Sequence, residues 1–375
     1  MSITYGAGLA SWLEPDRVLE LRDQHPAGHA GFGLEIGEAD GVVTAARMRV
    51  GYMHRGAEKL FESRDYRQAM MLADRHDWLS AFHSELMIAL ALEQTMGITP
   101  PERATWSRMI VAEANRIAAL LAFIAPVLDD EPRRSASACR EAWLQAQEAA
   151  TGMRVHAMYA RLGGVAHPLD ESAFDALRRA AELTEASWPS ITEALEAYAE
   201  SLAGLAVLTL EQAVAFGASG VVAHGSGLPL DMRRAQPYLA YEAVAEALPV
   251  LSGITCDGDA RSRYLAMLPQ VPASLACIRE ALDRLAGLDG APVDVLLPKT
   301  VRAPEGTTML SIEGPLGIMG CVLVSAGDVT PYRLRVRTAS YNNAQAMQAA
   351  LVGTPVERLG EAVMSFPFVV GDIDR

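Results

Sequence analysis

Apolar residues recur along this chain with two different periods, and the period changes from segment to segment. Between Gly31 and Val50 they tend to alternate with polar residues around a Glu38-Ala39-Asp40-Gly41 turn, a pattern that predicts a β-hairpin. From Ser63 to Met96 they recur at helical spacing, and Gly97 provides a stop signal. We therefore expect strand structure first and a long helix after it.

The remainder of the chain is predominantly helical by the same criterion. Thr99-Pro100-Pro101-Glu102 is a typical helix start, with a capping residue, prolines in the first turn and an acid behind them. Helical periodicity covers 99–126, 135–159, 171–208, 259–285 and 343–351. Residues 287–306 are rich in Pro and Gly and predict a connection, followed by strands at 318–325 and 332–338.

These elements predict a mainly α fold with β structure at both ends, a long-helix bundle of the α+β class. The expected divisions are a β-rich segment at 1–62, a helical bundle at 63–287 and an α/β segment at 288–375 packed back on it, all within one large domain. The most apolar stretch, Leu86–Leu92, is short and lies between two glutamates, so we expect no membrane span. Residues 1–16 do not resemble a signal peptide.

Composition narrows the possible functions further. The net charge of −14 argues against binding nucleic acid or an anionic lipid surface. The four cysteines, at positions 139, 256, 277 and 321, contain no Cys-x-x-Cys pair, which argues against a disulfide scaffold and a thiolate metal site. Four buried, reduced thiols are the expected arrangement, and they indicate a cytoplasmic chain.

Polar clusters interrupt the apolar chain and are its candidate functional segments. In Gln24–His29, two histidines flank a Pro and a Gly, and they either bind a metal or ligand or are ordinary loop residues. Gly51–Gly56 and Asp74–Trp78 follow, and the second lies within an expected helix. Because apolar turns flank Asp74–Trp78, some of its charges must point inward.

Three later clusters, read singly, predict surface ion pairs. They are Glu113–Arg116, His156–Gly164 and Gly371–Arg375. The chain contains no Gly-rich phosphate loop, no Gly-x-Ser-x-Gly elbow and no His-Glu-x-x-His motif. A nucleotide-binding enzyme, a serine hydrolase and a zincin are therefore disfavoured.

Taken together, the clusters resemble the D subunit of NADH-quinone oxidoreductase, the respiratory complex I, a family that is similar to the large subunit of nickel–iron hydrogenases. The resemblance covers nearly the whole chain. The matching segments, in order, are QHPAGHA at 24–30, GYMHRGAEKL at 51–60, DRHDWLSAF at 74–82, AEANRIA at 112–118, YARLGGV at 159–165, LDMRRAQPYLAYE at 230–242, PYRLRVRTASYNN at 331–343 and GDIDR at 371–375.

The resemblance also indicates what is missing. Hydrogenases of this superfamily hold nickel and iron with two Cys-x-x-Cys pairs, and this chain has Asp77 and Ser80 at one pair and Val369 and Asp372 at the other. A nickel–iron centre requires thiolate ligands. The expected cofactor set is therefore none bound by this chain, with quinone as substrate and an iron–sulfur cluster in a partner subunit.

The resemblance implies a quinone site. A loop histidine corresponds to His29, the acid that holds it to Asp130, and a helix tyrosine that hydrogen-bonds the quinone to Trp78. An indole N–H can donate a hydrogen bond but does not give up a proton as a phenol does. Further positions along the cavity or close to the partner's cluster correspond to His25, Arg55, Asp77, His156 and Arg161.

Two hypotheses follow. In the first, the chain forms one wall of a quinone cavity beside an iron–sulfur partner of the B type, and His29 supports quinone reduction. In the second, it is a structural or coupling subunit with a degenerate site; Trp78 and a shortened 288–313 segment favour this view, whereas the retained His29, Asp130 and His156 oppose it. Leu120 in place of a family histidine marks the chain as a divergent member or paralogue. Either way, the resemblance implies C-type and membrane-arm partners and a peripheral location on the cytoplasmic side of the cell membrane.

Overall fold

The structure, a computed structural model, describes residues 2–7, 17–19, 32–249 and 255–375. The strands are β1 (Ser2–Ala7), β2 (Arg17–Leu19), β3 (Phe32–Ala39), β4 (Val42–Arg49), β5 (Ala160–Arg161), β6 (Gly164–Val165), β7 (Gly306–Gly314), β8 (Gly317–Ser325) and β9 (Arg333–Arg337). The helices are α1 (Ala57–Phe61), α2 (Tyr66–Ala73), α3 (Ala81–Met96), α4 (Glu102–Ile124), α5 (Asp130–Thr151), α6 (Glu171–Glu200), α7 (Leu210–Phe216), α8 (Gly220–Gly225), α9 (Met232–Ala235), α10 (Ala260–Leu265), α11 (Gln270–Ala286), α12 (Ala339–Ala350), α13 (Leu359–Met364) and α14 (Val370–Ile373). Short 3₁₀ turns are η1 (Ala125–Val127), η2 (Tyr241–Ala247) and η3 (Val356–Arg358).

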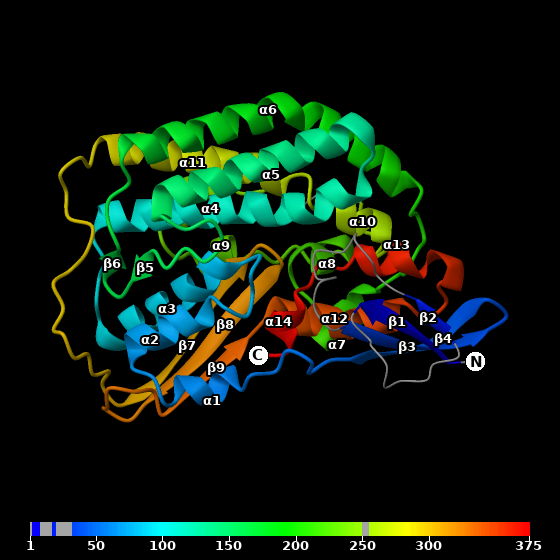
Figure 1. Cartoon of the computed structure of the whole chain (residues 1–375), viewed down its shortest axis with the longest axis horizontal. Helices are drawn as coiled ribbons and strands as arrows, with labels where there is room; N and C mark the ends of the chain where they lie inside the picture. Colours follow the sequence, from blue (N-terminus) through cyan, green and yellow to red (C-terminus); the bar gives the residue numbers. More distant parts are fainter. Residues whose placement is uncertain (1, 8–16, 20–31, 250–254) are drawn as a thin grey trace.

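The four longest elements of the predicted bundle, α4, α5, α6 and α11, stack together on one side of the molecule (Figure 1). The mixed α+β class is thus confirmed. Three boundaries were predicted wrongly: α5 begins at Asp130 and ends at Thr151, and α6 ends at Glu200. Gly152, with a left-handed φ of 80°, terminates α5, which explains why the predicted continuation to residue 159 is not helical.

Helix α4 lies at the centre of this layer. Its extension from Glu102 to Val127 is long and apolar enough to cross a membrane, but 89% of its most apolar part is buried inside the protein. A helix whose apolar surface is covered on all sides by its own chain is a core helix. The burial of α4 therefore accounts for its composition.

The predicted helix from Ser63 to Met96 is wrong, because residues 74–80 interrupt it. Helix α2 starts with a capping box between Asp65 and Gln68, and it ends at Ala73. In the interruption, the Asp77 carboxylate accepts the backbone N–H groups of Leu79 (3.1 Å) and Ser80 (2.9 Å). An aspartate that binds its own following backbone competes with helix formation, so the polar cluster lies in a loop.

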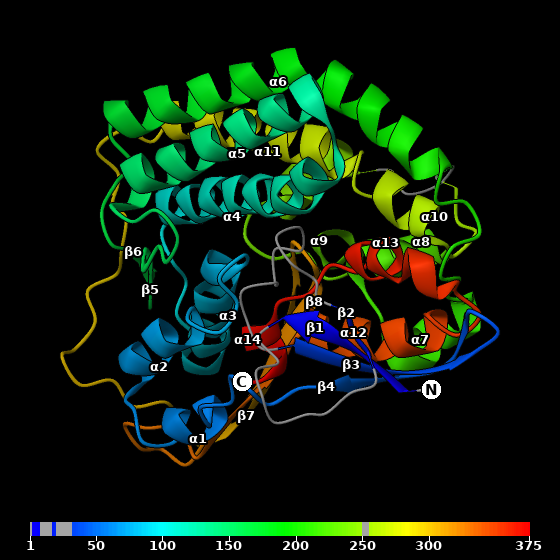
Figure 2. The same ribbon diagram turned by 45° about the vertical axis from the view of Figure 1, so that its right-hand side comes forward.

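The predicted hairpin is confirmed as β3 and β4, whose turn residues Asp40 and Gly41 have φ of 52° and 77°. Positive φ at both positions is typical of the tight type I′ turn. The sheet has the order β2-β1-β3-β4, and Val43 of β4 donates a backbone hydrogen bond to Thr354 after α12. The first sheet is thereby joined to the last third of the chain (Figure 2).

The second large sheet has the order β7-β8-β9, and its strands pair antiparallel. Strands β8 and β9 confirm two predictions, whereas β7 was missed. The predicted helix at 259–285 is two helices, because Pro269 and Pro272 follow one another closely between α10 and the first turn of α11. Three cysteines are buried as expected, but Cys256 is exposed, so that part of the prediction is wrong.

A short hairpin, β5–β6, packs against the extended 291–297 segment. Arg108 binds Glu93 with both terminal nitrogens (2.9 and 2.6 Å) and also the Gly164 carbonyl (2.8 Å). A Cβ on Gly164 would lie 2.2 Å from the backbone oxygen of Val293. Only a glycine therefore fits between the hairpin and the extended segment.

We expect Gly164→Ala to lower the free energy of unfolding by about 1–3 kcal/mol, the usual cost of forcing extra volume into a packed interior. Gly287→Ala is the matched control, because Gly287 has a negative φ and an added Cβ there has no contact closer than 3.5 Å. Thermal denaturation of both variants measures the difference. Equal melting temperatures would contradict the packing argument.

Candidate functional site

Asp77, Ser80, Val369 and Asp372, which the resemblance places at the hydrogenase thiolate positions, lie on two segments, 74–80 and 369–375, that touch each other. A Cβ placed on Gly371 would lie 2.5 Å from the backbone oxygen of His76 and 2.7 Å from a ring carbon of Trp78. The contact leaves no room for a side chain at 371. It brings Asp77 and Asp372 into the same buried region, where both are at most 2% exposed.

These two carboxyl groups have strongly perturbed proton affinities. Burial raises the pKa of Asp77 to about 6, although hydrogen bonds from Ser80 and Leu79 oppose the shift. Burial and the charge of Asp77 together raise the pKa of Asp372 to about 8. Two carboxyl groups that repel each other in a dry environment hold one proton between them near neutral pH.

Segment 369–375 also holds the loop before α1. The Asp374 carboxylate accepts the backbone N–H groups of Gly51 (2.7 Å) and Met53 (2.8 Å), and His54 Nδ1 lies 2.9 Å from the Asp374 carbonyl oxygen. The polar clusters at 51–56, 74–78 and 371–375 are therefore one structural unit. The prediction of surface ion pairs at 371–375 is wrong for Asp372, which is 1% exposed.

A second group of predicted residues surrounds Asp74, whose side chain is fully buried. Its carboxylate pairs with Arg75 Nε at 2.8 Å, and His156 Nδ1 lies 3.1 Å from its backbone oxygen. Arg55 donates to the backbone oxygen of Arg75 at 3.0 Å. Burial raises the pKa of Asp74 to about 6, and burial together with Arg75 lowers the pKa of His156.

Arg161 belongs to the same surface. It is exposed, donates to the backbone oxygens of Met158 and Ala160, and its charge partly offsets the burial of Glu85. Glu85 Oε1 accepts the N–H groups of Tyr159 and Ala160 at 2.9 Å each, and burial raises the pKa of Glu85 to about 7. The structure thus brings Arg55, His156 and Arg161 to one face, on which Arg55 and Arg161 carry the positive charge, whereas the lowered pKa of His156 disfavours its charged form.

His25 and His29 lie outside the described residues. Asp130 is exposed and is the first residue of α5, with a left-handed φ of 47°. At 1.5 Å per residue, Asp130 lies about 15 Å along the helix from Arg140, which lines a small cavity with Trp78. The pairing of Asp130 with His29 stays a prediction.

Trp78 is partly exposed, and on one side it borders only a very small cavity. The cavity that it lines with Asn115, Arg140 and Leu144 has a volume of about 20 Å³, which is room for about one water molecule. A quinone ring cannot enter there. An acceptor that contacts the indole must approach from a different side.

A buried ionic network lies below α4, where the sequence predicted surface pairs for Glu113–Arg116. Glu113 is fully buried and binds Arg116 Nε (3.2 Å), Arg233 Nη1 (3.3 Å), Tyr241 OH (2.5 Å) and Ser274 OH (2.5 Å). Burial would raise the pKa of Glu113, but the two arginines outweigh that effect and lower it to about 2. The prediction of surface pairs is therefore wrong here.

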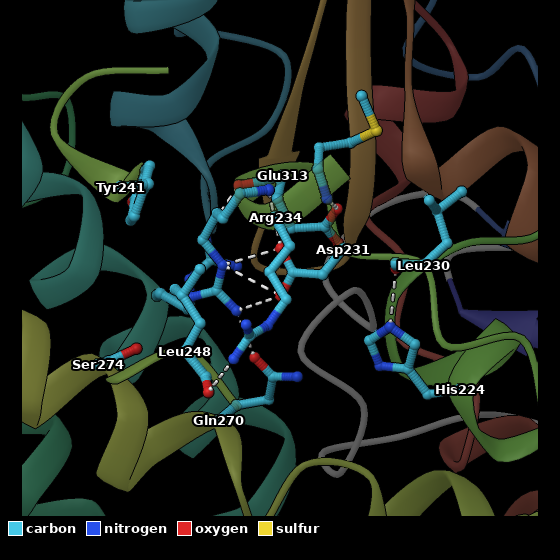
Figure 3. A network of polar contacts seen from close by, with 12 residues as sticks. His224, Leu230, Asp231, Arg234, Tyr241, Leu248, Gln270, Ser274 and Glu313 are labelled. Carbon is cyan, nitrogen blue, oxygen red and sulfur yellow. Dashed lines mark hydrogen bonds and ion pairs between the residues drawn. The ribbon is translucent and has the colours of Figure 1, made fainter. Parts of the chain in front are cut away.

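The network continues into α9 and β7. Arg233 also binds Asp231 (2.7 Å) and Gln270 (2.9 Å), and this region is drawn in Figure 3. Glu313, at the end of β7, accepts the Met232 amide at 3.0 Å, and its own backbone oxygen binds Arg116. Burial and the Asp231 charge raise the pKa of Glu313 to about 8.

Sequence reasoning missed Asp74, Glu85 and Glu313 as perturbed acids. Glu85 and Glu313 lie in apolar surroundings, and a lone acid inside a run of apolar residues is the available signal. Their partners, however, are backbone groups far away in the chain.

Within the described ranges, no three His, Cys, Asp or Glu residues form a group that could hold a metal ion.

Comparison with known proteins identifies the class. The family model of the 49 kDa subunit of respiratory-chain NADH dehydrogenase matches residues 134–299 and 293–375. The chain belongs to this family.

The relatives carry a more specific name. The D subunit numbered 2 of the NADH-quinone oxidoreductase of Salinispora tropica is 43% identical over 100% of this chain and 97% of its own length. The D subunit numbered 1 of Streptomyces coelicolor is 41% identical over 99% and 98% of the two chains. The D subunit of Geobacillus thermodenitrificans is 30% identical over 96% and 98%. This chain is therefore similar to these D subunits along essentially its whole length.

Proposed function

We propose that this chain is the D subunit of an NADH-quinone oxidoreductase and forms one wall of its quinone site. The observation that carries the proposal is the junction of 51–56, 74–80 and 369–375, which gathers the polar clusters shared with that family around Trp78. Full-length similarity to D subunits supports it. The ancestral metal positions hold carboxyl, hydroxyl and alkyl groups, so the hydrogenase-like bundle serves a different ligand.

Electrons reach the site from an iron–sulfur group in a partner subunit. The face that carries Arg55, His156 and Arg161 is the surface that we assign to this partner, because the positive charge of the two arginines beside a cluster favours its reduced form. His29, held by Asp130, donates a hydrogen bond or proton to the quinone. The chain lies on the cytoplasmic side of the membrane and is held there by its partners, C-type and membrane-arm proteins among them.

His29→Ala tests the catalytic hypothesis. We expect quinone reduction by the assembled complex to fall about a hundredfold, the lower end of the usual contribution of a positioned proton donor. His167→Ala is the matched control, because this histidine is exposed near the β5–β6 hairpin. The rate is followed with a short-chain quinone, and co-purification with the iron–sulfur partner verifies assembly.

The two hypotheses give different results in this experiment. If the His29→Ala complex assembles and transfers electrons at the rate of the His167→Ala complex, the site is degenerate and the structural role replaces the catalytic one.

The same preparations test whether the chain requires its iron–sulfur partner. The chain expressed alone should aggregate, because a wall of a shared cavity exposes apolar surface.

A further inference from the structure

We propose that the outer face of the β7–β8–β9 sheet binds an acidic segment of another subunit of the oxidoreductase, through a hollow lined by Arg335, Arg337 and Arg375. The hollow has a volume of about 450 Å³. Among the described residues that line it there is no aspartate or glutamate. Nor does any described residue assigned above to the quinone or to the iron–sulfur partner line it, so the inference goes beyond the proposed function.

The register of the sheet explains why the arginines lie together. In β9, Arg333, Arg335 and Arg337 alternate with two buried apolar residues, so the three arginines share the outer face. The residue opposite Arg337 on β8 is Gly320, which has no side chain and so leaves space in the hollow. Residues two apart in a strand are about 6.6 Å apart. An extended peptide has the same spacing, so acids at its alternate positions can each reach one arginine.

Helix α1 already binds one end of this row of arginines, and it does so with acids. The Arg333 guanidinium donates to Glu62 Oε1 at 2.9 Å and to Glu58 Oε2 at 2.8 Å. Glu58 Oε1 also accepts the backbone N–H of Val336 at 3.0 Å and lies 3.5 Å from Arg375 Nε. Figure 1 shows α1 beside β9. The contact indicates what this part of the sheet binds: carboxylates carried by one short segment.

The row of arginines continues beyond α1 without further carboxylates in contact. Arg337 donates to two backbone oxygens, at 2.5 and 2.8 Å, and it feels the charges of Glu313 and Asp372 without forming an ion pair with either. Arg335 is exposed and makes no hydrogen bond or ion pair with the residues that the structure describes. In a chain with 46 acidic and 32 basic residues, a hollow lined by arginines and by no acid favours an external anion.

The rim of the hollow suits a protein segment better than a membrane surface. Met309 and Tyr341, which are 72% and 43% exposed, line the hollow beside the arginines. Arginine, methionine and tyrosine side chains are enriched together in protein interfaces. An anionic bilayer, by contrast, is an extended charged plane that the net charge of −14 would repel. The occupant is therefore a short segment of a partner subunit that carries at least two Asp or Glu residues.

The test places a reactive amine in the hollow of the assembled complex. A carbodiimide joins an amine to a carboxylate in contact with it, forming an amide bond and taking up the water that is lost, whereas it does not join an arginine. We expect Arg335→Lys to give a cross-link between position 335 and an Asp or Glu of another subunit, identified by mass spectrometry. Arg179→Lys is the control, because Arg179 is also exposed but lies on α6, away from the sheet, and should give no such cross-link.

Charge reversal tests the same contact by a second measurement. We expect Arg335→Glu to make the cross-linked subunit dissociate about tenfold faster or more, since losses of interfacial charge pairs act largely on dissociation. Arg179→Glu should leave dissociation unchanged. Replacing the cross-linked acid of the partner by lysine, together with Arg335→Glu, should restore retention, because the pair is then reversed rather than broken.

The outcomes that overturn the inference are distinct. An Arg335→Lys complex that keeps all its subunits but cross-links position 335 only within this chain, or not at all, excludes an acidic partner in the hollow. If the wild-type complex binds phosphatidylglycerol vesicles and Arg335→Glu abolishes this binding, the hollow binds a membrane instead. Both measurements are independent of quinone reduction. A wild-type complex that reduces no quinone overturns the proposed function and leaves the cross-link result unaffected.

Discussion

Glu113→Gln is expected to lower the free energy of unfolding by about 3–5 kcal/mol, the usual cost of breaking a buried ion pair by removing one partner. The substitution keeps the shape of the side chain and removes its charge. Arg116 and Arg233, each at most 2% exposed, then lose their common counter-charge while remaining buried. An uncompensated buried charge is among the most destabilising changes a protein interior can undergo.

The chain contains a matched control for this experiment. Glu131 and Arg134 form a pair with the same three-residue spacing on α5, but their side chains are 72% and 69% exposed. Glu131→Gln should change stability by less than about 1 kcal/mol, because exposed pairs contribute little. Urea denaturation of both variants, co-purified with the iron–sulfur partner, measures the difference. Equal effects would show that the buried network contributes no more than a surface pair.

Glu313→Gln is expected to make the protein more stable than wild type at alkaline pH and to leave it unchanged near pH 5, which lies close to the ordinary pKa of a glutamate. The folded protein holds the Glu313 proton up to a pKa of about 8, because burial and Asp231 disfavour the carboxylate. The unfolded chain releases it near the ordinary pKa of 4.5. A glutamine resembles the protonated acid and never becomes charged.

The direction in which stability changes with pH follows from the raised pKa of Glu313. Below about 4.5 both states bind the proton, and the contribution of Glu313 to stability is fully present. As pH rises from there to about 8, only the folded state keeps the proton, so stability falls. The slope is at most about 1.4 kcal/mol per pH unit for one proton.

Melting temperatures of the wild type and the variant across this range measure the effect. Glu305→Gln is the control, because Glu305 is an exposed acid immediately before the same strand. The curves of Glu313→Gln and wild type should diverge with rising pH, and those of Glu305→Gln and wild type should stay parallel. If the curves of Glu313→Gln and wild type also stay parallel, the pKa of Glu313 in the folded protein is near the ordinary value.

The elements that sequence reasoning found are those whose signals are local. The β3–β4 hairpin follows from alternation and an Asp-Gly turn, the start of α4 follows from the Thr99-Pro100-Pro101-Glu102 segment, and the start of α6 follows from helical periodicity. The wrongly predicted helices are those in which a side chain interrupts the helical spacing of the apolar residues. Asp77 binds its own following backbone and ends the helical pattern, and two prolines divide α10 from α11.

The candidate site was predicted from motifs shared with a family, and its geometry required long-range contacts. Gly371 against Trp78 and Asp374 against Gly51 join segments about 300 residues apart, and nothing local encodes these pairs. Burial of Glu113 was also missed. An acid beside an arginine on a helix looks the same in a sequence whether the pair faces water or the core.

The anchoring of 51–82 by 369–375 has a consequence for biosynthesis. The first sheet, the loop before α1 and the loop that carries Trp78 leave the ribosome early, whereas Asp372 and Asp374 are synthesised some 300 residues later. Until then the backbone amides of Gly51 and Met53 lack their native acceptor, the Asp374 carboxylate. The site therefore cannot be completed before residue 374 has been translated, and the early segments stay without these contacts during that delay.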